Sequence, residues 1–165
     1  MNTRDLWIKY AKFAAIVGLV VLLDQITKTM VIRMMPLFDS IVVVPGFFNL
    51  THVHNPGGAF GLLAKNGAVW RHWLFLGAAV FALGIILFFH HRTPKALPWL
   101  AGSLAMIFGG AVGNMIDRVR FGEVVDFLDV YVASYHWPTF NVADSAVSVG
   151  IAVFILHILL KKMPL

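Results

Sequence analysis

The 165-residue sequence contains no cysteine, and only 13% of its residues are charged. The lack of cysteine excludes disulfide bonds, thiolate catalysis, zinc sites with cysteine ligands and lipid attachment to a cysteine of this chain. A soluble domain usually carries about 25% charged residues. With so few charges and 59% hydrophobic residues, the chain would expose extensive apolar surface to water, so a bilayer is its expected solvent.

The formal net charge of the chain is +5, a value that can indicate binding to nucleic acid. Its basic residues are scattered, however, and they flank apolar runs instead of forming one cluster. We therefore expect a membrane-lipid environment and no nucleic-acid partner.

The N-terminal segment is similar to a signal peptide, because basic residues precede an apolar run over 13–23. Small residues that would mark a cleavage site are missing, since Leu22, Leu23 and Asp24 stand there instead. We predict that this segment is kept as the first membrane span.

A helix rises about 1.5 Å per residue, so a crossing needs about 20 mostly apolar residues. The segments that meet this condition are 13–32, 70–89, 97–116 and 140–160. The predicted fold class is mainly α: an integral membrane bundle of four transmembrane helices. We expect residues 1–165 to form a single membrane domain.

The distribution of lysine and arginine predicts the orientation, because these residues are more frequent in short cytoplasmic flanks. Seven lie on the side of the two termini, namely Arg4, Lys9, Lys12, Arg92, Lys95, Lys161 and Lys162. Five lie on the other side, namely Arg33, Lys65, Arg71, Arg118 and Arg120. We therefore expect both termini in the cytoplasm and the two long polar segments, 34–69 and 117–139, outside.

The first of these external segments has the pattern of β-strands. Residues 41–44 are β-branched, Pro45 and Gly46 interrupt them, and a second run over 47–54 ends at the turn sequence that starts with Asn55. We predict a small β-sheet that lies on the outer membrane surface.

Charged residues inside a span are costly, so their positions are informative. Asp24 and Lys28 are four residues apart and share a helix face. The sequence leaves two interpretations of Asp24 and Lys28 open: a structural ion pair, or a role in a functional site. Asp144 follows Asn141 by three residues at the start of the last span, which taken alone is the pattern of an N-cap with an acid in the first turn.

Asp126 is flanked by apolar residues after the third span and, like Asp117 and Asp129, is compatible with a turn acid when taken alone. Together, however, Asp126 and Asp144 both fall at the predicted outer surface within apolar sequence. Two buried carboxyl groups close together cannot both ionise easily, so they share a proton. One then activates water while the other polarises a carbonyl, which is the chemistry of aspartic peptidases.

Other chemistries have weaker support in the sequence. His52 and His54 form an H-x-H pair on one strand face, but a third ligand and an H-E-x-x-H motif are missing. A core or surface role is the better interpretation of both. We expect neither a metal nor another cofactor.

Five separated blocks of the sequence resemble bacterial lipoprotein signal peptidase, also called signal peptidase II. These blocks are Leu23-Asp24-Gln25-x-x-Lys28, Asn55-Pro56-Gly57-Gly58-Ala59-Phe60-Gly61, Gly109-Gly110-Ala111-Val112-Gly113-Asn114-x-x-Asp117-Arg118, Gly122-x-Val124-Val125-Asp126-Phe127 and Phe140-Asn141-Val142-Ala143-Asp144-Ser145. The resemblance covers nearly the whole chain, and the blocks follow the family's order.

The resemblance implies an endopeptidase of the bacterial inner membrane that cleaves prolipoproteins before a cysteine carrying diacylglycerol. It implies Asp126 and Asp144 as the catalytic dyad. The residues it implies as lining or supporting the site are Asp24, Lys28, Asn55, Gly110, Asn114, Arg118, Asn141 and Ala143. Globomycin-type inhibitors are expected in the same groove, and a monomer is expected to suffice.

Two other classes of function stay open at the sequence level. A small proton-coupled transporter would use acids and lysines as relay groups through the membrane depth, whereas here the charged residues gather toward one surface. A non-catalytic scaffold would not require the asparagines and aspartates of the five blocks.

Overall fold

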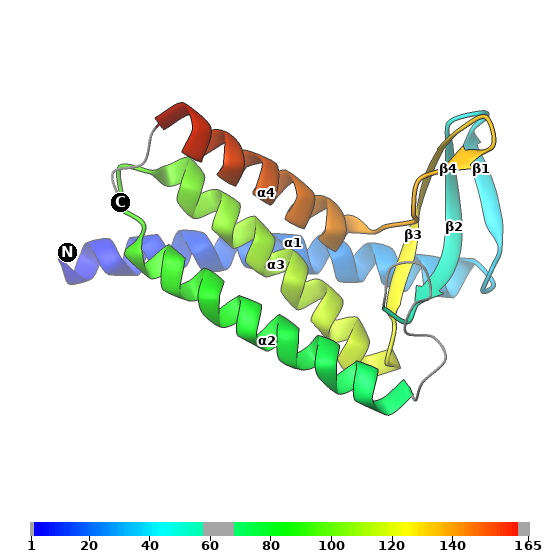
Figure 1. Cartoon of the computed structure of the whole chain (residues 1–165), viewed down its shortest axis with the longest axis horizontal. Helices are drawn as coiled ribbons and strands as arrows, with labels where there is room; N and C mark the ends of the chain where they lie inside the picture. The colour runs from blue at the N-terminus through cyan, green and yellow to red at the C-terminus, as the bar shows by residue number, and fades with distance from the viewer. Residues whose placement is uncertain (1, 58–67, 162–165) are drawn as a thin grey trace.

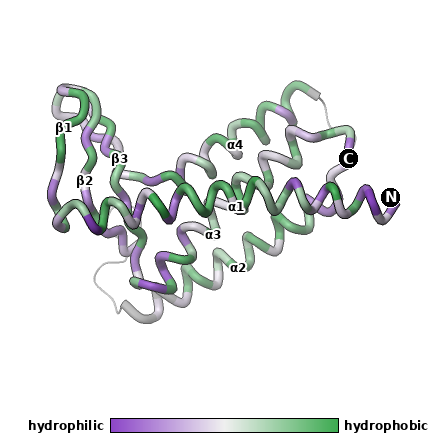
Figure 2. Tube along the Cα trace, turned by 180° about the vertical axis from the view of Figure 1, so that it is seen from behind, coloured by the Kyte–Doolittle hydropathy of each residue, from purple (hydrophilic) through white to green (hydrophobic). Residues whose placement is uncertain are grey.

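Long helices make up most of the molecule in the computed structural model, which describes residues 2–57 and 68–161 (Figure 1). They are α1 (Thr3–Met34), α2 (Ala68–Arg92), α3 (Pro98–Phe121) and α4 (Val142–Lys161). All four are long and apolar enough to cross a membrane, and Figure 2 shows hydrophobic residues along most of their lengths. The predicted four-helix membrane bundle is therefore confirmed. Residues 58–61, Lys65 and Lys162, on which sequence predictions depended, lie outside the described residues.

Helix α1 extends further toward the N-terminus than its apolar stretch. It begins at Thr3 instead of near residue 13, and the side chain of Asn2 accepts a hydrogen bond from the Arg4 amide at 3.2 Å. Such a cap satisfies an amide that the helix itself leaves unpaired. Polar residues lower the hydropathy of this first part without preventing helix formation, so hydropathy placed the start too late.

Helix α3 likewise continues beyond residue 116, where the apolar segment ends. It stops at Phe121 because Gly122 adopts a φ of 78°, and the Gly122 amide donates a hydrogen bond to the Arg118 carbonyl at 3.0 Å. Residues 117–121, which the sequence assigned to the segment between the third and fourth spans, therefore belong to α3. Arg118 is thereby held on the same helix as Asn114, four residues before it.

Helix α3 packs against the other three helices, and closest to α4. At Gly110 a Cβ atom would overlap with the Ala143 carbonyl and the Val147 side chain of α4. At Gly109 a Cβ atom would come within 2.9 Å of Val20 in α1. Glycine is therefore required at both positions for close helix approach. Gly110 and Ala143, both predicted to support the site, bring α3 and α4 together.

An antiparallel sheet lies at the end of the bundle away from the N-terminus (Figure 1). Its strands, in spatial order, are β1 (Ser40–Val44), β2 (Phe48–Asn55), β3 (Val124–Val132) and β4 (Tyr135–His136). The first two match the predicted strands. The last two come from segment 117–139, for which no strands were predicted, and β3 is paired along β2 with Asn55 opposite Val124.

A small hydrophobic cluster joins the sheet to the helices. Val31 and Met35 at the end of α1 pack against Phe127 of β3, and the partly buried Leu128 and Val142 extend this contact to the start of α4. The cluster fixes β3 relative to α4. These are the two elements that carry Asp126 and Asp144.

Candidate active site

Asp126 lies on β3 and is only 2% exposed. One carboxylate oxygen, Oδ1, accepts a hydrogen bond from Asn141 Nδ2 at 2.7 Å. The other, Oδ2, accepts from Asn55 Nδ2 at 3.0 Å. Asn55 stands at the end of the neighbouring strand β2, so sheet pairing places its amide beside the carboxyl group.

Asp144 lies in the first turn of α4. Its Oδ1 accepts a hydrogen bond from Asn114 Nδ2 of α3 at 2.7 Å. Its backbone amide donates to Asn141 Oδ1 at 2.9 Å, and the Asn141 amide donates back to Asp144 Oδ2 at 3.3 Å. This reciprocal pair caps α4. The capping interpretation of Asn141 and Asp144 thus describes the same contacts that fix the orientation of Asp144.

Asn141 connects the two aspartates and is fully buried. Its Oδ1 accepts from the Asp144 backbone, while its Nδ2 donates to Asp126 Oδ1 and lies 3.1 Å from Asn114 Oδ1. Because one amide group makes all of these contacts, its orientation is determined. The structure therefore brings Asp126, Asp144, Asn114, Asn141 and Asn55 into one hydrogen-bonded group.

The pKa of Asp126 is raised from its ordinary value of 3.8 to about 6. Burial is the main cause, because it removes water from the charged form, and the nearby charge of Asp144 raises the pKa further. The hydrogen bonds from Asn55 and Asn141 act in the opposite direction, as does the charge of Lys28. Asp126 can therefore hold a proton at a pH where an exposed aspartate cannot.

We expect this burial to make stability depend on pH. The folded state binds the Asp126 proton more tightly than the unfolded chain, so its contribution to stability is fully present below about pH 4 and is lost as pH rises through about 6. The loss amounts to at most about 3 kcal/mol in the free energy of unfolding. Thermal unfolding in detergent between pH 4 and 7.5 measures it. The Asp126→Asn protein should lack this component, and equal pH profiles for both proteins would contradict the raised pKa.

A second polar group supports the first from inside the bundle. Lys28 of α1 is 2% exposed and forms ion pairs with Asp24 at 2.9 Å and with Asp117 at 2.8 Å. Lys28 Nζ also donates to Asn114 Oδ1 at 3.0 Å. Since Asn114 donates to Asp144, the ammonium group fixes which end of the Asn114 amide faces the carboxylate. The predicted ion pair between Asp24 and Lys28 is therefore present, and Lys28 is also hydrogen-bonded to Asn114.

The two acids of this group also bind backbone amides of the elements that carry the dyad. Asp24 Oδ1 accepts from the Ala143 amide at 2.9 Å, at the start of α4. Asp117 Oδ2 accepts from the Val125 amide at 3.1 Å, next to Asp126 on β3. The buried ion-pair group therefore positions both β3 and α4.

Asp117 and Gln25 were not among the predicted site residues. Gln25 Nε2 donates to Asp117 Oδ1 at 3.0 Å and to Asp24 Oδ2 at 3.1 Å, which completes the group. Asp117 follows Asn114 by three residues and thus shares its helix face. That spacing was the available signal, but the predicted third span ended at residue 116, so Asp117 fell in the external segment 117–139 and was compatible with a turn acid.

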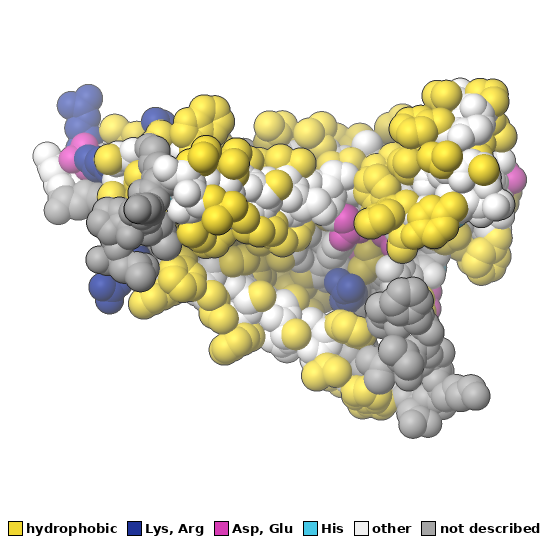
Figure 3. Space-filling view, turned by 45° about the horizontal axis from the view of Figure 1, so that its top comes forward, with side chains coloured by type: hydrophobic (Ala, Val, Ile, Leu, Met, Phe, Trp, Pro, Cys, Tyr) yellow, Lys and Arg dark blue, Asp and Glu magenta, His cyan; other side chains and the backbone are white. Residues whose placement is uncertain are grey.

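Arg118 is half-buried and lies over the ring of Phe75 in α2, with its guanidinium carbon 5.4 Å from the ring centre. Its charge acts on Asp144, Asp126 and Asp117. Among residues 2–57 and 68–161, it makes no hydrogen bond to either carboxyl group of the dyad. Figure 3 shows acidic and basic side chains where the helices meet the sheet, on a face that is otherwise mainly hydrophobic.

Asn55 also shapes the chain that leaves β2. Its Oδ1 accepts a hydrogen bond from the Gly57 amide at 2.9 Å. Gly57 has a φ of 83°, and a Cβ atom there would lie 2.5 Å from the ring of Phe75. One side chain thus fixes both the Asp126 carboxylate and the start of the segment after β2.

The two strand histidines lie apart from the dyad's hydrogen bonds. His52 Nδ1 contacts the Met35 carbonyl at 2.9 Å, and the two Nε2 atoms of His52 and His54 are 3.3 Å apart. His54 also approaches Glu123 at 3.5 Å. Within the described part of the chain, no group of three or more histidine or acidic side chains is arranged to hold a metal ion.

Comparison with known proteins relates this chain to signal peptidase II, also named lipoprotein signal peptidase. The family model for signal peptidase (SPase) II matches residues 16–160. The chain is 48% identical over 164 residues to the lipoprotein signal peptidase of Desulforapulum autotrophicum, with 99% of each protein covered. It is 47% identical over 144 residues to that of Geobacter sulfurreducens, with 87% of this chain and 89% of the relative covered.

Two solved structures of bacterial membrane enzymes have the same fold. The structure at 1.9 Å resolution gives a TM-score of 0.82 at 33% identity, covering 93% of this chain and 95% of the other. The structure at 2.3 Å gives a TM-score of 0.81 at 32% identity, covering 92% and 90%. Sequence and fold therefore agree over nearly the full length.

Proposed function

The chain belongs to the signal peptidase II family, and on this premise we propose that it cleaves prolipoproteins before a diacylglyceryl-modified cysteine, with Asp126 and Asp144 as the catalytic dyad. The observation that carries this proposal is the buried Asn141 side chain. Its amide contacts Asp126 and the start of α4 at Asp144 at the same time. Such a link holds two carboxyl groups in one arrangement, as a general acid–base pair requires.

In the proposed reaction the dyad carries one proton. The ionised carboxylate takes a proton from water, whose oxygen attacks the scissile carbonyl carbon, while the protonated carboxyl group donates a hydrogen bond to the carbonyl oxygen. The tetrahedral intermediate then breaks at its C–N bond, and a dyad proton passes to the leaving nitrogen. The products are a carboxylic acid on the signal peptide and an amine on the lipidated cysteine, and the dyad again carries one proton. The raised pKa of Asp126 favours it as the carrier of the shared proton.

The other site residues have positioning roles in this proposal. Asn141, Asn114 and Asn55 donate hydrogen bonds that orient the carboxylates. Arg118, whose charge acts on both carboxylates, makes no guanidinium hydrogen bond within the described residues and can donate to a carbonyl of the substrate backbone. Asp24 and Lys28 hold this arrangement from behind, and Gly110 with Ala143 lets the two helices approach.

The surroundings suit a substrate that is itself held in lipid. The dyad lies at the junction of the apolar helices and the sheet, so a diacylglyceryl chain can stay in the bilayer while the peptide reaches the carboxyl groups. Strand β1, at the outer edge of the sheet, exposes Ile41, Val42, Val43 and Val44. We propose that the sheet lies at the outer face of the bacterial inner membrane, that both termini are cytoplasmic, and that a monomer is active. Globomycin-type inhibitors would occupy the same groove.

We expect cleavage to depend on the lipid group of the substrate. Purified protein in detergent should cut a diacylglyceryl-modified prolipoprotein before its cysteine, with a kcat/KM at least about tenfold above that for the unmodified form, because buried acyl chains add binding energy. Mass spectrometry of the products identifies the bond. Cleavage at another bond, or equal rates on both substrates, would contradict the proposal. Proton-coupled flux in liposomes without any cleavage would instead favour the transporter alternative.

A further inference from the structure

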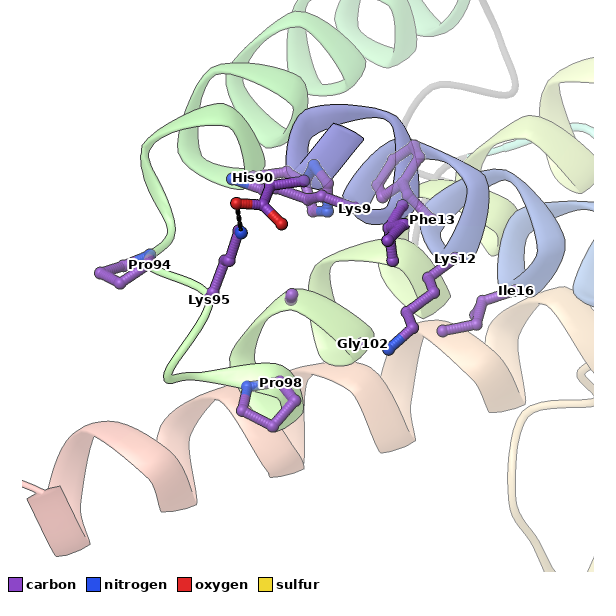
Figure 4. A pocket seen from close by; sticks show the side chains of 12 residues that line it. Lys9, Lys12, Phe13, Ile16, His90, Pro94, Lys95, Pro98 and Gly102 are labelled. Carbon is purple, nitrogen blue, oxygen red and sulfur yellow. Dashed lines mark ion pairs between the residues drawn. The ribbon is translucent and has the colours of Figure 1, made fainter. Parts of the chain in front are cut away.

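A pocket of about 260 Å³ lies at the end of the bundle opposite the sheet and the proposed active site (Figure 4). It is formed by the first turns of α1, the end of α2, the turn between α2 and α3, and the start of α3. Its lining combines an apolar floor with lysines. Its lining includes Lys12, Lys95, His90, Ile16 and Gly102, together with one acid, Asp5.

The lysines that line this pocket differ in the hydrogen bonds and ion pairs that they form. Lys9 Nζ is satisfied by the carbonyls of His91 and Thr93, at 2.8 Å each, where α2 ends. Lys95 forms an ion pair with Asp5, drawn as the dashed line in Figure 4. Lys12 makes no hydrogen bond or ion pair within the described residues. The pocket therefore presents a lysine whose charge is available to an anion.

A buried histidine forms part of the wall of the pocket. His90 lines the pocket and is 1% exposed, yet its Nδ1 has no hydrogen-bond partner within the described residues. Its ring is fixed by Phe13, with ring centres 4.2 Å apart, and by Tyr10 at 5.5 Å. This Nδ1 atom is also closed to solvent, so the His90 ring contributes to the pocket as part of its packed wall.

The apolar part of the pocket shows what kind of anion fits. Ile8, Phe13, Ile16 and Ala101 line it together with Gly102. A Cβ atom at Gly102 would meet only Ile16 Cδ1, at 4.0 Å, so the space between α1 and α3 is open at this point. A small inorganic anion would leave these apolar surfaces unused. A basic peptide would be repelled by the lysines.

We infer that this pocket binds one anionic phospholipid, with its phosphate at Lys12 and the upper part of one acyl chain along Ile16 and Gly102. A single chain enters between α1 and α3, where the helices face the bilayer. The site is remote from the dyad, so it does not depend on the proposed reaction.

Native mass spectrometry of the full chain in detergent tests this inference, with dioleoyl phosphatidylglycerol or dioleoyl phosphatidylcholine as the added lipid. The wild type should retain one phosphatidylglycerol with an affinity at least about fivefold above that for phosphatidylcholine, because one lysine near a membrane surface contributes roughly this factor toward an anionic lipid. The Lys12→Gln protein should lose this preference. Equal retention of both lipids by the wild type would overturn the inference.

Two further variants distinguish a specific lipid-binding site from diffuse electrostatic attraction of anionic lipid. Arg4→Gln removes the same charge from the same end of α1, at an exposed side chain outside the pocket, and should keep the preference. Gly102→Leu fits sterically next to the backbone but fills the groove, and should lower phosphatidylglycerol retention as much as Lys12→Gln. Equal losses for Arg4→Gln and Lys12→Gln would show diffuse electrostatics and refute the site. Competition by inorganic phosphate at equal concentration would also refute a lipid ligand.

Discussion

Replacing either Asp126 or Asp144 with asparagine is expected to lower kcat for prolipoprotein cleavage by about a thousandfold or more. Asparagine keeps the size of the side chain but can neither take a proton from water nor share one with its partner. Because the two carboxyl groups act as one unit, each single substitution should cost about as much as both together. Turnover of a fluorescent diacylglyceryl-modified prolipoprotein by the purified variants measures the effect.

Asp129→Asn provides a matched control on the same strand. Asp129 is also buried, at 6% exposure, but its oxygens accept from Asn49 at 2.9 Å and contact His136 at 2.8 Å instead of joining the dyad. This variant should cleave at a rate close to that of the wild type. The dyad assignment is wrong if Asp126→Asn or Asp144→Asn stays near normal in a folded protein, or if Asp129→Asn is impaired equally.

The second large effect is expected for Lys28→Met. Loss of the Lys28 ammonium group would leave Asp24 and Asp117, which are 0% and 1% exposed, without their cation. Breaking a buried ion pair by removing one partner costs about 3–5 kcal/mol. We therefore expect a lower free energy of unfolding by about that amount, measured by thermal or SDS-induced unfolding in detergent.

The same substitution should also slow catalysis in the molecules that remain folded. Without Lys28 Nζ, the Asn114 amide loses the contact that fixes its orientation toward Asp144. A fall of about 10–100-fold in kcat with little change in KM would indicate a positioning role. A residue with a purely structural role would lower the folded fraction but leave kcat per folded molecule unchanged.

Arg33→Met is the matched control, because it removes a cation from an exposed position near the end of the same helix. It should change neither unfolding nor kcat appreciably. Adding Asp117→Asn to Lys28→Met should recover part of the stability, since one of the two unpaired buried charges is then removed. An unfolding midpoint for Lys28→Met equal to that of Arg33→Met would show that the ion-pair group contributes little.

The sequence by itself determined the membrane class and the number of spans. Long apolar runs in a chain with so few charges are best solvated by lipid. Within lipid, a single span must form its backbone hydrogen bonds internally, so each run was predicted to be a helix. The first two strands were also local signals, because β-branched residues lie between turn residues. The pairing of Asn141 with Asp144 was visible too, since a helix cap depends on residues three apart.

Only the tertiary structure decided which buried partner each aspartate contacts. Asp117, Asp126 and Asp129 are similar in sequence context, yet Asp117 binds Lys28, Asp126 binds Asn141 and Asp129 binds Asn49. These partners come from other helices and strands, so no local pattern distinguishes them. The predicted end of the third span, residue 116, also differs from the end of α3 at Phe121. Hydropathy indicates where the apolar segment ends, whereas the helix continues into polar sequence. The paired strands β3 and β4 and the connecting role of Asn141 depend on contacts between distant segments, which form only when the helices and the sheet are packed together.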